Sequence, residues 1–384
     1  MTPPGRHIVV LGTQPEMLLG LRGPMIRDFL RRGYRVTAIG AEEMESVRAA
    51  FESWGADYTV VPIRRAGLNP IRDLRSLVGL FQALRRLRPD LLLAYTVKPI
   101  VYGIPIARLA GVPRRFAMIT GRGFAFLEGR EFKRRMARRL ATVLYRLGLA
   151  SADGVMFHNE DDCALFLREG MISTSTRMTR IWGSGVDLDQ HRPAPLPALP
   201  EADEGAMTFL MIGRLLRDKG VREYVDAARI VQGRFPQARF RLAGPTDPSP
   251  NGVSDGEVAE WRREGVIEYL GPLSDVRAEI AACHVLVLPS YAEGLPRSVL
   301  EAMAAGRAVI TTDAPGCADT VEDGISGLLV PARDVTGLAD AMVRCIQSPG
   351  FVEGAGARAL DRARAIFDVR KVNAAIAAFL GLEG

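Results

Sequence analysis

Short apolar runs alternate along the chain with longer stretches in which apolar residues recur at helical spacing. The apolar runs predict buried strands at residues 7–11, 34–39, 57–61, 90–95, 154–157, 208–212, 240–243, 267–270, 285–288 and 308–311. The stretches between them predict helices, among them residues 18–32, 42–54, 71–87, 130–149, 296–305, 340–349, 353–367 and 369–382, with a further helix starting at Val221. Strands that alternate with helices are typical of parallel βαβ units, so both halves predict a doubly wound parallel sheet of the α/β class.

A proline-rich segment separates the two halves. Four prolines fall between Arg192 and Pro200, where they argue against helix or strand. A chain of 384 residues is also long enough for two domains. We therefore place the boundary near Pro195–Gly205 and expect a first domain of residues 1–195, a second domain of residues 206–366 and a C-terminal helix within residues 367–384.

Composition and charge limit the classes of protein and partner. A hydrophobic content of 48% and a charged content of 24% are ordinary for a soluble globular protein. The net charge of +6 and the pI near 9.3 favour an anionic partner, which leaves nucleotides, lipid phosphates, membrane surfaces and nucleic acids open. No signal peptide and no apolar stretch of about twenty residues is apparent, so we expect a soluble or peripheral protein. Disulfide and zinc-site spacings are absent, which predicts reduced, buried thiols in a cytoplasmic protein, at Cys163, Cys283, Cys317 and Cys345.

Two cations follow the predicted strand 208–212. The exit from that strand reads Gly213-Arg214-Leu215-Leu216-Arg217-Asp218-Lys219-Gly220 and leads directly into a helix. The glycines leave the backbone open, while Arg214 and Lys219 supply positive charge. This combination suits a diphosphate, whose two charges need both cations and N–H donors.

The stretch from Val285 to Thr312 combines a strand, a loop, a helix and another strand. The loop holds Glu293 followed by Gly294-Leu295-Pro296, and the helix that starts near Pro296 holds Glu301. A helix N-terminus favours an anion, whereas a carboxylate beside it can accept hydrogen bonds from sugar hydroxyls. A solvated loop glutamate and a helix-surface glutamate are the alternative interpretation. Together with the two cations of the preceding loop, the carboxylates fit a nucleotide-diphosphate-sugar site.

Three loops of the first half lie where a parallel sheet binds its ligands, beyond the carboxyl ends of the strands. The first starts at Gly12 and carries Arg22, the second carries Lys98, and the third contains Gly121, Arg122 and Gly123. These residues predict contacts to an acceptor or to its phosphate, although Gly12 is equally consistent with a tight turn and Lys98 with a solvated lysine. The first loop lacks GxGxxG, which argues against a dinucleotide site.

The predicted strand 154–157 is followed by His158 and Asn159. Asn159 and the acidic residues after it predict a helix cap. His158 would lie at the edge of the sheet, but a lone histidine is more often structural, so we assign it no role.

The predicted helix 130–149 carries both an apolar stripe and a basic cluster. An interfacial helix on anionic lipid has this pattern, and so does a surface helix whose stripe packs on its own sheet. We weigh the core interpretation at roughly two to one over membrane insertion, while the cations can still attract the protein to a membrane. The stripe consists of Phe132, Met136, Leu140, Val143, Leu144 and Leu147, and the cations include Arg134, Arg135, Arg138 and Arg139.

Several of these motifs resemble those of one family. The stretch from Val285 to Thr312 is similar to the EX7E segment of the GT4 family of retaining glycosyltransferases, and residues 213–220 are similar to its GR…KG segment. TVKPIVYG (96–103) and ITGRGFAF (119–126) look like segments of GT4 enzymes that extend lipid-linked glycans of O-antigen, capsule and exopolysaccharide. The resemblance implies a GT-B fold, in which two Rossmann-like domains face each other across a cleft and a C-terminal helix crosses back to the first domain.

The resemblance also implies an activity. This is transfer of a hexosyl or N-acetylhexosaminyl group from a UDP-sugar, with retention, to a polyprenyl-diphosphate-linked acceptor at the cytoplasmic face of the inner membrane. It assigns Arg214 and Lys219 to the donor phosphates, Glu293 to donor-sugar hydroxyls and Glu301 to the ribose. We expect no cofactor and no metal, because two cations and a helix N-terminus neutralise the diphosphate. Relatives often carry a histidine in the loop that corresponds to residues 121–124; none is present here, so no catalytic histidine is assigned.

Other interpretations remain open. A UDP-N-acetylhexosamine 2-epimerase can share the GT-B architecture, but its chemistry needs acid–base carboxylates and a histidine around the sugar, which we cannot assemble here. A nucleic-acid-binding protein would use the positive charge, but the cations cluster on one helix without interleaved aromatic residues, so we expect no nucleic-acid partner. A soluble acceptor is the alternative to a lipid-linked one.

Overall fold

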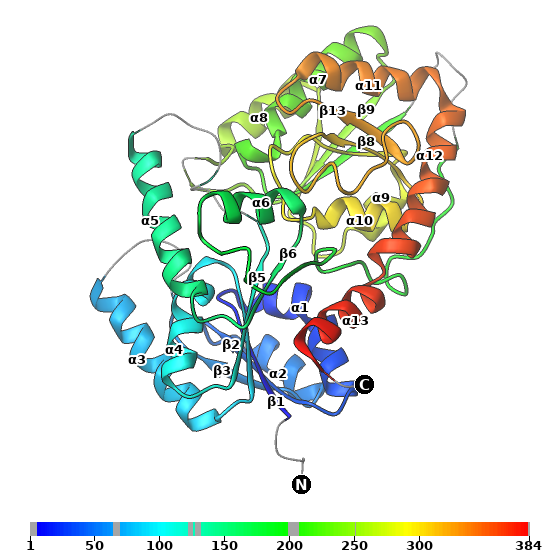
Figure 1. Ribbon diagram of the computed structural model, residues 1–384. Helices are drawn as coiled ribbons and strands as arrows, with labels where there is room; N and C mark the ends of the chain where they lie inside the picture. The colour runs from blue at the N-terminus through cyan, green and yellow to red at the C-terminus, as the bar shows by residue number, and fades with distance from the viewer. Residues whose placement is uncertain are drawn as a thin grey trace. The chain divides into compact units, whose positions relative to one another are not determined.

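The chain divides into two compact units in the computed structural model, which describes residues 6–63, 70–121, 126, 132–198, 207–249 and 251–382 (Figure 1). Unit 1 contains Met1–Ser184 and Val372–Gly384, and unit 2 contains Gly185–Lys371. The division therefore falls before the proline-rich segment, whereas the sequence predicts a boundary near Pro195–Gly205. The residues from Val372 onward belong to unit 1.

Unit 1 is built on a seven-stranded parallel sheet with the strand order β3-β2-β1-β4-β5-β6-β7. In the centre of the sheet, Ile8 of β1 pairs with Val36 on one side and with Leu91 on the other. Every residue of β1 and β4 is buried, as expected for parallel strands covered on both faces. The strands are β1 (His7–Leu11), β2 (Arg35–Gly40), β3 (Asp57–Val60), β4 (Leu91–Tyr95), β5 (Arg114–Ile119), β6 (Gly154–Phe157) and β7 (Met178–Arg180).

Two layers of helices cover this sheet (Figure 1). Successive residues of β1 alternate between two cores, with Ile8 and Val10 in one and Val9 and Leu11 in the other. The core around Val10 includes residues of α1 (Pro15–Arg31), α2 (Glu45–Ser53) and α13 (Val369–Leu380). The core around Leu11 includes residues of α3 (Pro70–Leu87), α4 (Ile104–Leu109), α5 (Phe132–Leu149) and α6 (Glu160–Arg168), with a π-helical turn, Pro99–Gly103, before α4.

Unit 2 is built on a six-stranded parallel sheet with the order β10-β9-β8-β11-β12-β13. Its strands are β8 (Thr208–Ile212), β9 (Arg239–Ala243), β10 (Glu268–Gly271), β11 (Val285–Leu288), β12 (Ala308–Thr312) and β13 (Gly327–Val330). Its helices are α7 (Val221–Arg234), α8 (Asp255–Glu264), α9 (Arg277–Ala281), α10 (Arg297–Ala304), α11 (Val335–Gln347) and α12 (Pro349–Arg362), which a π-helical turn, Ala363–Phe367, extends.

The two sheets share one architecture, as the alternation of strands and helices predicts. In each sheet the order runs outward from a first strand and then reverses, so the switch point lies between β1 and β4 in unit 1 and between β8 and β11 in unit 2. Open α/β sheets bind ligands beyond the carboxyl ends of the strands at such a point. The loops after these four strands are therefore the places to search for function.

Local signals predict most elements well and fail at the shortest ones. β1, β6, β8 and β11 have the predicted bounds, and the side chain of Asn159 caps α6 by accepting a hydrogen bond from the N–H of Asp162 at 2.8 Å. β7 and β13 are not predicted, because strands of three or four residues show little periodicity. The helix predicted to start at residue 340 begins at Val335, since Asp334 accepts a capping hydrogen bond from the N–H of Gly337 at 2.9 Å.

Candidate active site

The loop that follows β8 lies against the loop that follows β11. It forms a 3-10 turn, Arg217–Lys219, and ends at Gly220, whose φ of 72° is one that glycine adopts without strain. A Cβ atom on Gly220 would overlap the carbonyl oxygen of Pro289, so the two loops can approach this closely only with glycine at this position. The approach places Lys219 at the switch point of the unit 2 sheet.

Lys219 and Glu293 contact each other there. Lys219 Nζ donates a hydrogen bond to Glu293 Oε1, and the hydroxyl of Ser290 donates to the same oxygen at 2.8 Å. The backbone N–H of Glu293 donates to the carbonyl oxygen of Pro315 at 2.9 Å, and its own carbonyl lies against Gly316. Two residues predicted for the donor are thus side by side with opposite charges in contact. Ser290, which the sequence did not single out, holds the carboxylate in place.

Arg214 lies at the start of the same loop and is partly exposed. Its Nη1 atom is 3.3 Å from Asp247 Oδ2, a long and weakly stabilising surface ion pair. The backbone is packed tightly beneath it, because a Cβ atom on Gly244 would overlap the carbonyl oxygen of Gly213. Arg214 is therefore a cation on a well-supported loop whose side chain can turn to a ligand at little cost.

Glu301 lies inside α10 and is only 6% exposed, so the interpretation of a solvated helix-surface glutamate is wrong for this residue. Its Oε1 atom accepts a hydrogen bond from Arg297 Nε at 2.6 Å and lies 3.6 Å from His191 Nε2. Burial lowers the pKa of His191, and the nearby Glu301 carboxylate partly offsets that effect. Pro296 occupies the N-cap position of α10 without a side-chain cap, next to the half-buried Gly294 and Leu295.

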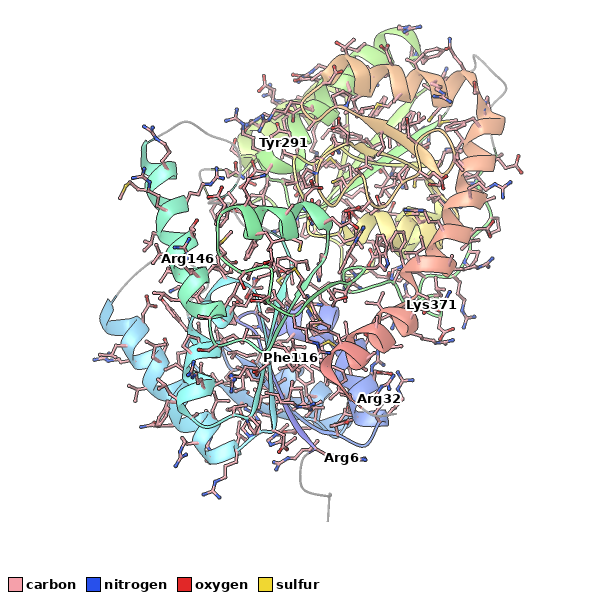
Figure 2. All side chains as sticks on the ribbon, viewed as in Figure 1. Arg6, Arg32, Phe116, Arg146, Tyr291 and Lys371 are labelled. Carbon is pink, nitrogen blue, oxygen red and sulfur yellow. The ribbon has the colours of Figure 1, made fainter. Side chains whose placement is uncertain are left out.

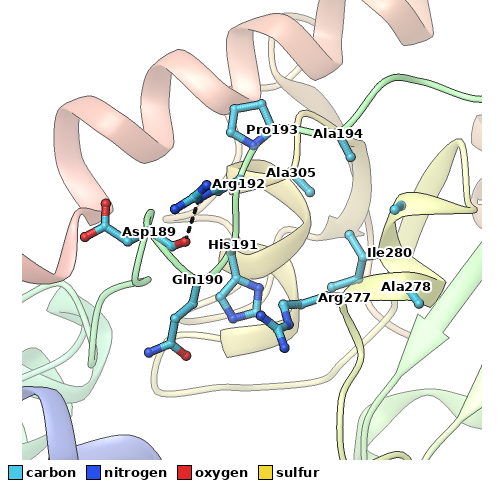
Figure 3. Close-up of a pocket in the computed structure, with 11 residues that line it drawn as sticks. Asp189, Gln190, His191, Arg192, Pro193, Ala194, Arg277, Ala278, Ile280 and Ala305 are labelled. Carbon is cyan, nitrogen blue, oxygen red and sulfur yellow. Dashed lines mark hydrogen bonds between the residues drawn. The ribbon is translucent and has the colours of Figure 1, made fainter.

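A cavity of about 560 Å³ lies within unit 2, beside Glu301 (Figure 3). None of the predicted donor residues lines it, but His191 does, and His191 is the residue that reaches Glu301. No motif in the sequence points to this cavity, because its walls come from short, separate segments. They are residues 189–194, the α9 residues Arg277, Ala278, Ile280 and Ala281, and Ala305 after α10.

At the switch point of the unit 1 sheet, Gly12 and Tyr95 lie close together. A Cβ atom on Gly12 would overlap the hydroxyl of Tyr95, so the glycine permits close approach rather than only a turn. Arg22, from α1, is 2% exposed and lies with its guanidinium 4.8 Å from the centre of the Tyr95 ring. Its Nη1 donates to the hydroxyl of Ser184 at 3.2 Å.

The structure describes two of the other residues predicted to contact the acceptor, Lys98 and Gly121. Lys98 is buried, and its Nζ donates to Asp73 Oδ1 at 2.8 Å, so the interpretation of a solvated lysine is wrong and the charge is already neutralised inside unit 1. Gly121 follows β5 with a φ of 138°, a conformation open to glycine. Arg122 and Gly123 lie outside the described residues.

Comparison with known proteins identifies the family. Residues 206–348 match the model for "Glycosyl transferases group 1", and residues 24–181 match the model for "Glycosyl transferase 4-like domain". Between them the two models cover most of both units. The chain is a glycosyltransferase of the GT4 family. The 2-epimerase interpretation is not favoured.

Relatives of this glycosyltransferase include two enzymes named for lipid-linked substrates. The N,N'-diacetylbacillosaminyl-diphospho-undecaprenol alpha-1,3-N-acetylgalactosaminyltransferase of Campylobacter jejuni is 29% identical over 297 residues, which cover 74% of this chain and 75% of the relative. The UDP-Gal:alpha-D-GlcNAc-diphosphoundecaprenol alpha-1,3-galactosyltransferase of Escherichia coli is 27% identical over 309 residues, which cover 78% and 75%.

Solved structures confirm the GT-B fold of the glycosyltransferase. Anabaena HepE, crystallised with UDP-glucose, has a TM-score of 0.75 at 21% identity, and the match covers 98% of this chain and 99% of that one. The sucrose-phosphate synthase of Thermosynechococcus elongatus has a TM-score of 0.78 at 20% identity, with 97% and 98% covered. At this level of identity the likeness concerns the fold alone.

The basic helix α5 of the glycosyltransferase differs from the prediction. Four residues of its apolar stripe are 43–64% exposed, so the core interpretation is wrong for them: Met136, Leu140, Val143 and Leu147. The helix packs on the sheet instead through Tyr145 and Leu149. Two cations are held by the protein, because Arg138 pairs with Glu169 at 2.7 Å and Arg146 donates to the carbonyl oxygen of Gly170 at 2.7 Å (Arg146 is labelled in Figure 2).

The remaining cations of the cluster include Arg134, Arg135 and Arg139. Arg135 and Arg139 are exposed, and the side chain of Arg134 lies outside the described part of the chain. Within the described residues, no helix has the length and apolar character needed to cross a membrane. The same residues contain no group of three or more His, Cys, Asp or Glu side chains arranged to hold a metal ion.

Proposed function

We propose that this enzyme transfers a hexosyl or N-acetylhexosaminyl group from a UDP-sugar to a glycan linked to polyprenyl diphosphate, with retention of anomeric configuration. The observation that carries the proposal is the contact between Lys219 and Glu293 at the switch point of unit 2, with Arg214 on the same loop. The names of the two bacterial relatives support a lipid-diphosphate-linked acceptor, and one of them names a UDP-sugar as donor.

Without a donor, the charges of Lys219 and Glu293 neutralise each other. Neither side chain is therefore available to a ligand until the donor diphosphate binds Lys219. A donor diphosphate attracts Lys219 more strongly than one carboxylate does, because it offers two negative charges and several acceptor oxygens. Glu293 then becomes available to accept hydrogen bonds from donor-sugar hydroxyls, while Ser290 keeps it in position. Lys219 and Arg214 stabilise the charge that builds on the departing diphosphate, which is the main electrostatic contribution to lowering the barrier.

Glu293 acts in this proposal as a hydroxyl acceptor and not as a nucleophile. Lys219 and Ser290 both donate hydrogen bonds to Oε1 of its carboxylate, which lowers the nucleophilicity of that oxygen and fixes the orientation of the group. The leaving phosphate takes the proton of the attacking acceptor hydroxyl on the same face of the sugar, so retention needs no covalent intermediate. We expect Glu293→Gln to reduce transfer strongly without forming a glycosyl-enzyme. Mass spectrometry that finds donor sugar attached to Glu293 in the unmodified enzyme would contradict this mechanism.

Glu301 is proposed to hold the donor ribose. The hydrogen bond from Arg297 already holds Oε1 of this carboxylate, which leaves the other oxygen for the two ribose hydroxyls. Loss of the carboxylate in Glu301→Gln is expected to raise the KM for the donor more than it lowers kcat. Steady-state kinetics with varied donor test this, and an unchanged donor KM excludes the role.

The exposed stripe of α5 supports a membrane-surface location. Four large apolar side chains spaced along one face, with Arg135 and Arg139 exposed on the same helix, form the pattern of a helix lying on anionic lipid. A membrane surface also gives access to a polyprenyl-linked acceptor. We therefore propose that the enzyme is cytoplasmic and binds peripherally to the inner membrane through α5.

Liposome sedimentation tests the location. Replacing Leu140 and Val143 by serine should reduce sedimentation with anionic vesicles by about tenfold, given the apolar area lost. Leu109→Ser is the matched control, since Leu109 is 71% exposed on α4, outside the stripe. Equal sedimentation of the stripe variant and the control would exclude α5 as the contact.

A donor screen tests the reaction itself. UDP release is measured with a panel of nucleotide sugars, with and without a polyprenyl-diphosphate-linked monosaccharide. Release that depends on this acceptor supports the proposal, whereas release only with a soluble sugar excludes the lipid-linked acceptor.

A further inference from the structure

Three polar groups at the carboxyl edge of the unit 1 sheet have no hydrogen-bond partner among the described residues. The Nε atom of Arg22, the hydroxyl of Tyr95 and the Nε2 atom of His158 are buried without a hydrogen-bond partner in the part of the chain that the structure describes. These residues are 2%, 3% and 4% exposed. Buried polar atoms are nearly always hydrogen-bonded, so each such atom calls for a partner that the protein does not supply.

The three side chains lie on one face of the sheet. Side chains alternate along a strand, and Leu93 and Tyr95 of β4 belong to the same core as Met156 of β6. His158, two residues after Met156, continues on that face. Arg22 reaches it from α1, which covers the same face, and its charge acts on His158 strongly enough to help burial lower the pKa of the imidazole.

Arg22 also lacks a counter-ion. Among the described residues no carboxylate pairs with it, and its contacts are the Ser184 hydroxyl and the Tyr95 ring. The attraction between a cation and an aromatic ring offsets a small part of the free energy needed to bury an unpaired charge.

A second buried arginine shows how this chain satisfies such a group when it is structural. Arg307 is fully buried in unit 2, and its guanidinium donates to five carbonyl oxygens at 2.8–3.1 Å, those of Ala194, Pro195, Ile280, Ala281 and Ala305. In the part of unit 1 that the structure describes, Arg22 donates to one hydroxyl and to no carbonyl oxygen. This difference indicates that the guanidinium of Arg22 binds a ligand and does not have a structural role like that of Arg307.

We propose that Arg22, Tyr95 and His158 form an oxyanion-binding site at the carboxyl edge of β1, β4 and β6. All three can donate hydrogen bonds to one group, and the uncompensated guanidinium selects a negative charge. The ligand chemistry is therefore that of a phosphate or diphosphate. As the subsite for the diphosphate of a lipid-linked acceptor, it rests on the proposed function.

The surrounding backbone is arranged for a bound group. Gly12 lets the Tyr95 hydroxyl lie directly against the backbone of the loop after β1, because a Cβ atom there would overlap it. Thr96, directly after Tyr95, has a φ of 67°, a strained conformation for a β-branched residue that is found preferentially at functional sites. Ser184, which accepts a hydrogen bond from Arg22, is half-buried and lies between Gly183 and Gly185, whose φ values are 62° and 66°.

Pyrophosphate binding tests the site directly. Calorimetry with enzyme saturated with UDP, which occupies the unit 2 cations, should show a pyrophosphate site that weakens at least about tenfold in Arg22→Met, as expected for loss of charge-assisted hydrogen bonds. Arg22→Lys and His158→Gln should lie between that variant and the unmodified enzyme. Arg27→Met is the matched control, because Arg27 is on the same helix but stacks over Trp54 instead. Unchanged binding in Arg22→Met, or no binding to the UDP-saturated enzyme, overturns the proposal.

Kinetics separate the source of the oxyanion. If the acceptor diphosphate occupies the site, Arg22→Met raises the KM for a short prenyl-diphosphate-linked sugar at least about tenfold and leaves the donor KM unchanged. If pyrophosphate binding is lost while the acceptor KM stays constant, the site takes free phosphate instead. If no transfer to a prenyl-diphosphate sugar occurs at all, the proposed function fails, and the calorimetry still decides whether the oxyanion site exists.

Discussion

The cations at the carboxyl edges of the two sheets differ in whether a carboxylate pairs with them. In unit 2 three cations near the switch point pair with carboxylates: Lys219 with Glu293, Arg214 with Asp247 and Arg297 with Glu301. In unit 1 Lys98 pairs with Asp73, whereas the contacts of Arg22 among the described residues are a hydroxyl and an aromatic ring. The cations of the unit 2 pairs are partly exposed and can exchange their carboxylate for a ligand, whereas Arg22 is buried. The two sheets share a topology but offer an anion different sites. Unit 2 offers cations that are paired with carboxylates, and unit 1 offers a buried cation that no described carboxylate pairs with.

The two arrangements differ in their expected cost. A partly exposed ion pair contributes little to stability, so opening it for a substrate costs about 1 kcal/mol or less. An uncompensated buried cation costs several kcal/mol while its site is empty. The predictions below test this contrast, beginning with the largest effect.

Removing the unit 2 charge should have the largest effect. Lys219→Met is expected to lower kcat by roughly 10²–10³, because the charge on the leaving diphosphate loses a preorganised cation. Single-turnover kinetics with saturating donor measure the loss. Arg217→Met, in the same 3-10 turn but exposed, is the control and should retain activity. A loss below tenfold in Lys219→Met would mean that its pairing with Glu293 is structural.

The two buried arginines should respond oppositely to the same substitution. Arg307→Met leaves five carbonyl oxygens without a donor and is expected to lower the free energy of unfolding by at least about 3 kcal/mol. Arg22→Met removes a charge that has no counter-ion and is expected to be neutral or stabilising. Denaturant unfolding of both variants measures the difference. If Arg22→Met destabilises the protein as much as Arg307→Met, Arg22 is a structural residue and the contrast between the edges disappears.

Acid should weaken both units through their histidines. Burial lowers the pKa of each of the four, His7, His158, His191 and His284. Their folded pKa values lie below the unfolded value near 6.5, so the unfolded state binds more protons, and stability present above pH 6.5 is lost as the pH falls below it. Thermal unfolding between pH 7.5 and 5 should show this decline. His158→Gln should flatten it most, because the pKa of His158 is lowered well below the ordinary value; an identical slope would contradict this assignment.

Removing metal should have the smallest effect. If two cations and the N-terminus of α10 bind the donor diphosphate as proposed, EDTA treatment is expected to change kcat by less than about twofold. Transfer assays before and after dialysis against EDTA measure this. Activity that is lost with EDTA and restored by a divalent cation would show that Lys219 and Arg214 do not neutralise the donor alone.

Local sequence predicts the parts of the molecule that depend on neighbours along the chain. β11, the helix after Pro296 and the loop from Gly213 to Gly220 could be read from apolar runs, glycines and charges, and the same stretches carry the likeness to the GT4 family. The doubly wound architecture follows from the alternation of these elements. β13 and the start of α11 could not be read, because a four-residue strand and a single capping bond at Asp334 leave almost no periodic signal.

Tertiary structure alone decided which charges meet. Lys219 and Glu293 are 74 residues apart, and they meet because β8 pairs with β11 and Gly220 lies against Pro289. Neither the burial of Arg22 nor the exposure of the α5 stripe could be predicted from the sequence. The spacing of apolar residues on a helical face is the same whether that face packs on a sheet or is exposed to solvent. By itself the sequence determined the type of each side chain and its local conformation. Burial and charge pairing depend on what the rest of the fold places beside each group. Arg22 of α1 is therefore a candidate ligand-binding residue because of its surroundings in the fold and not because of its local sequence.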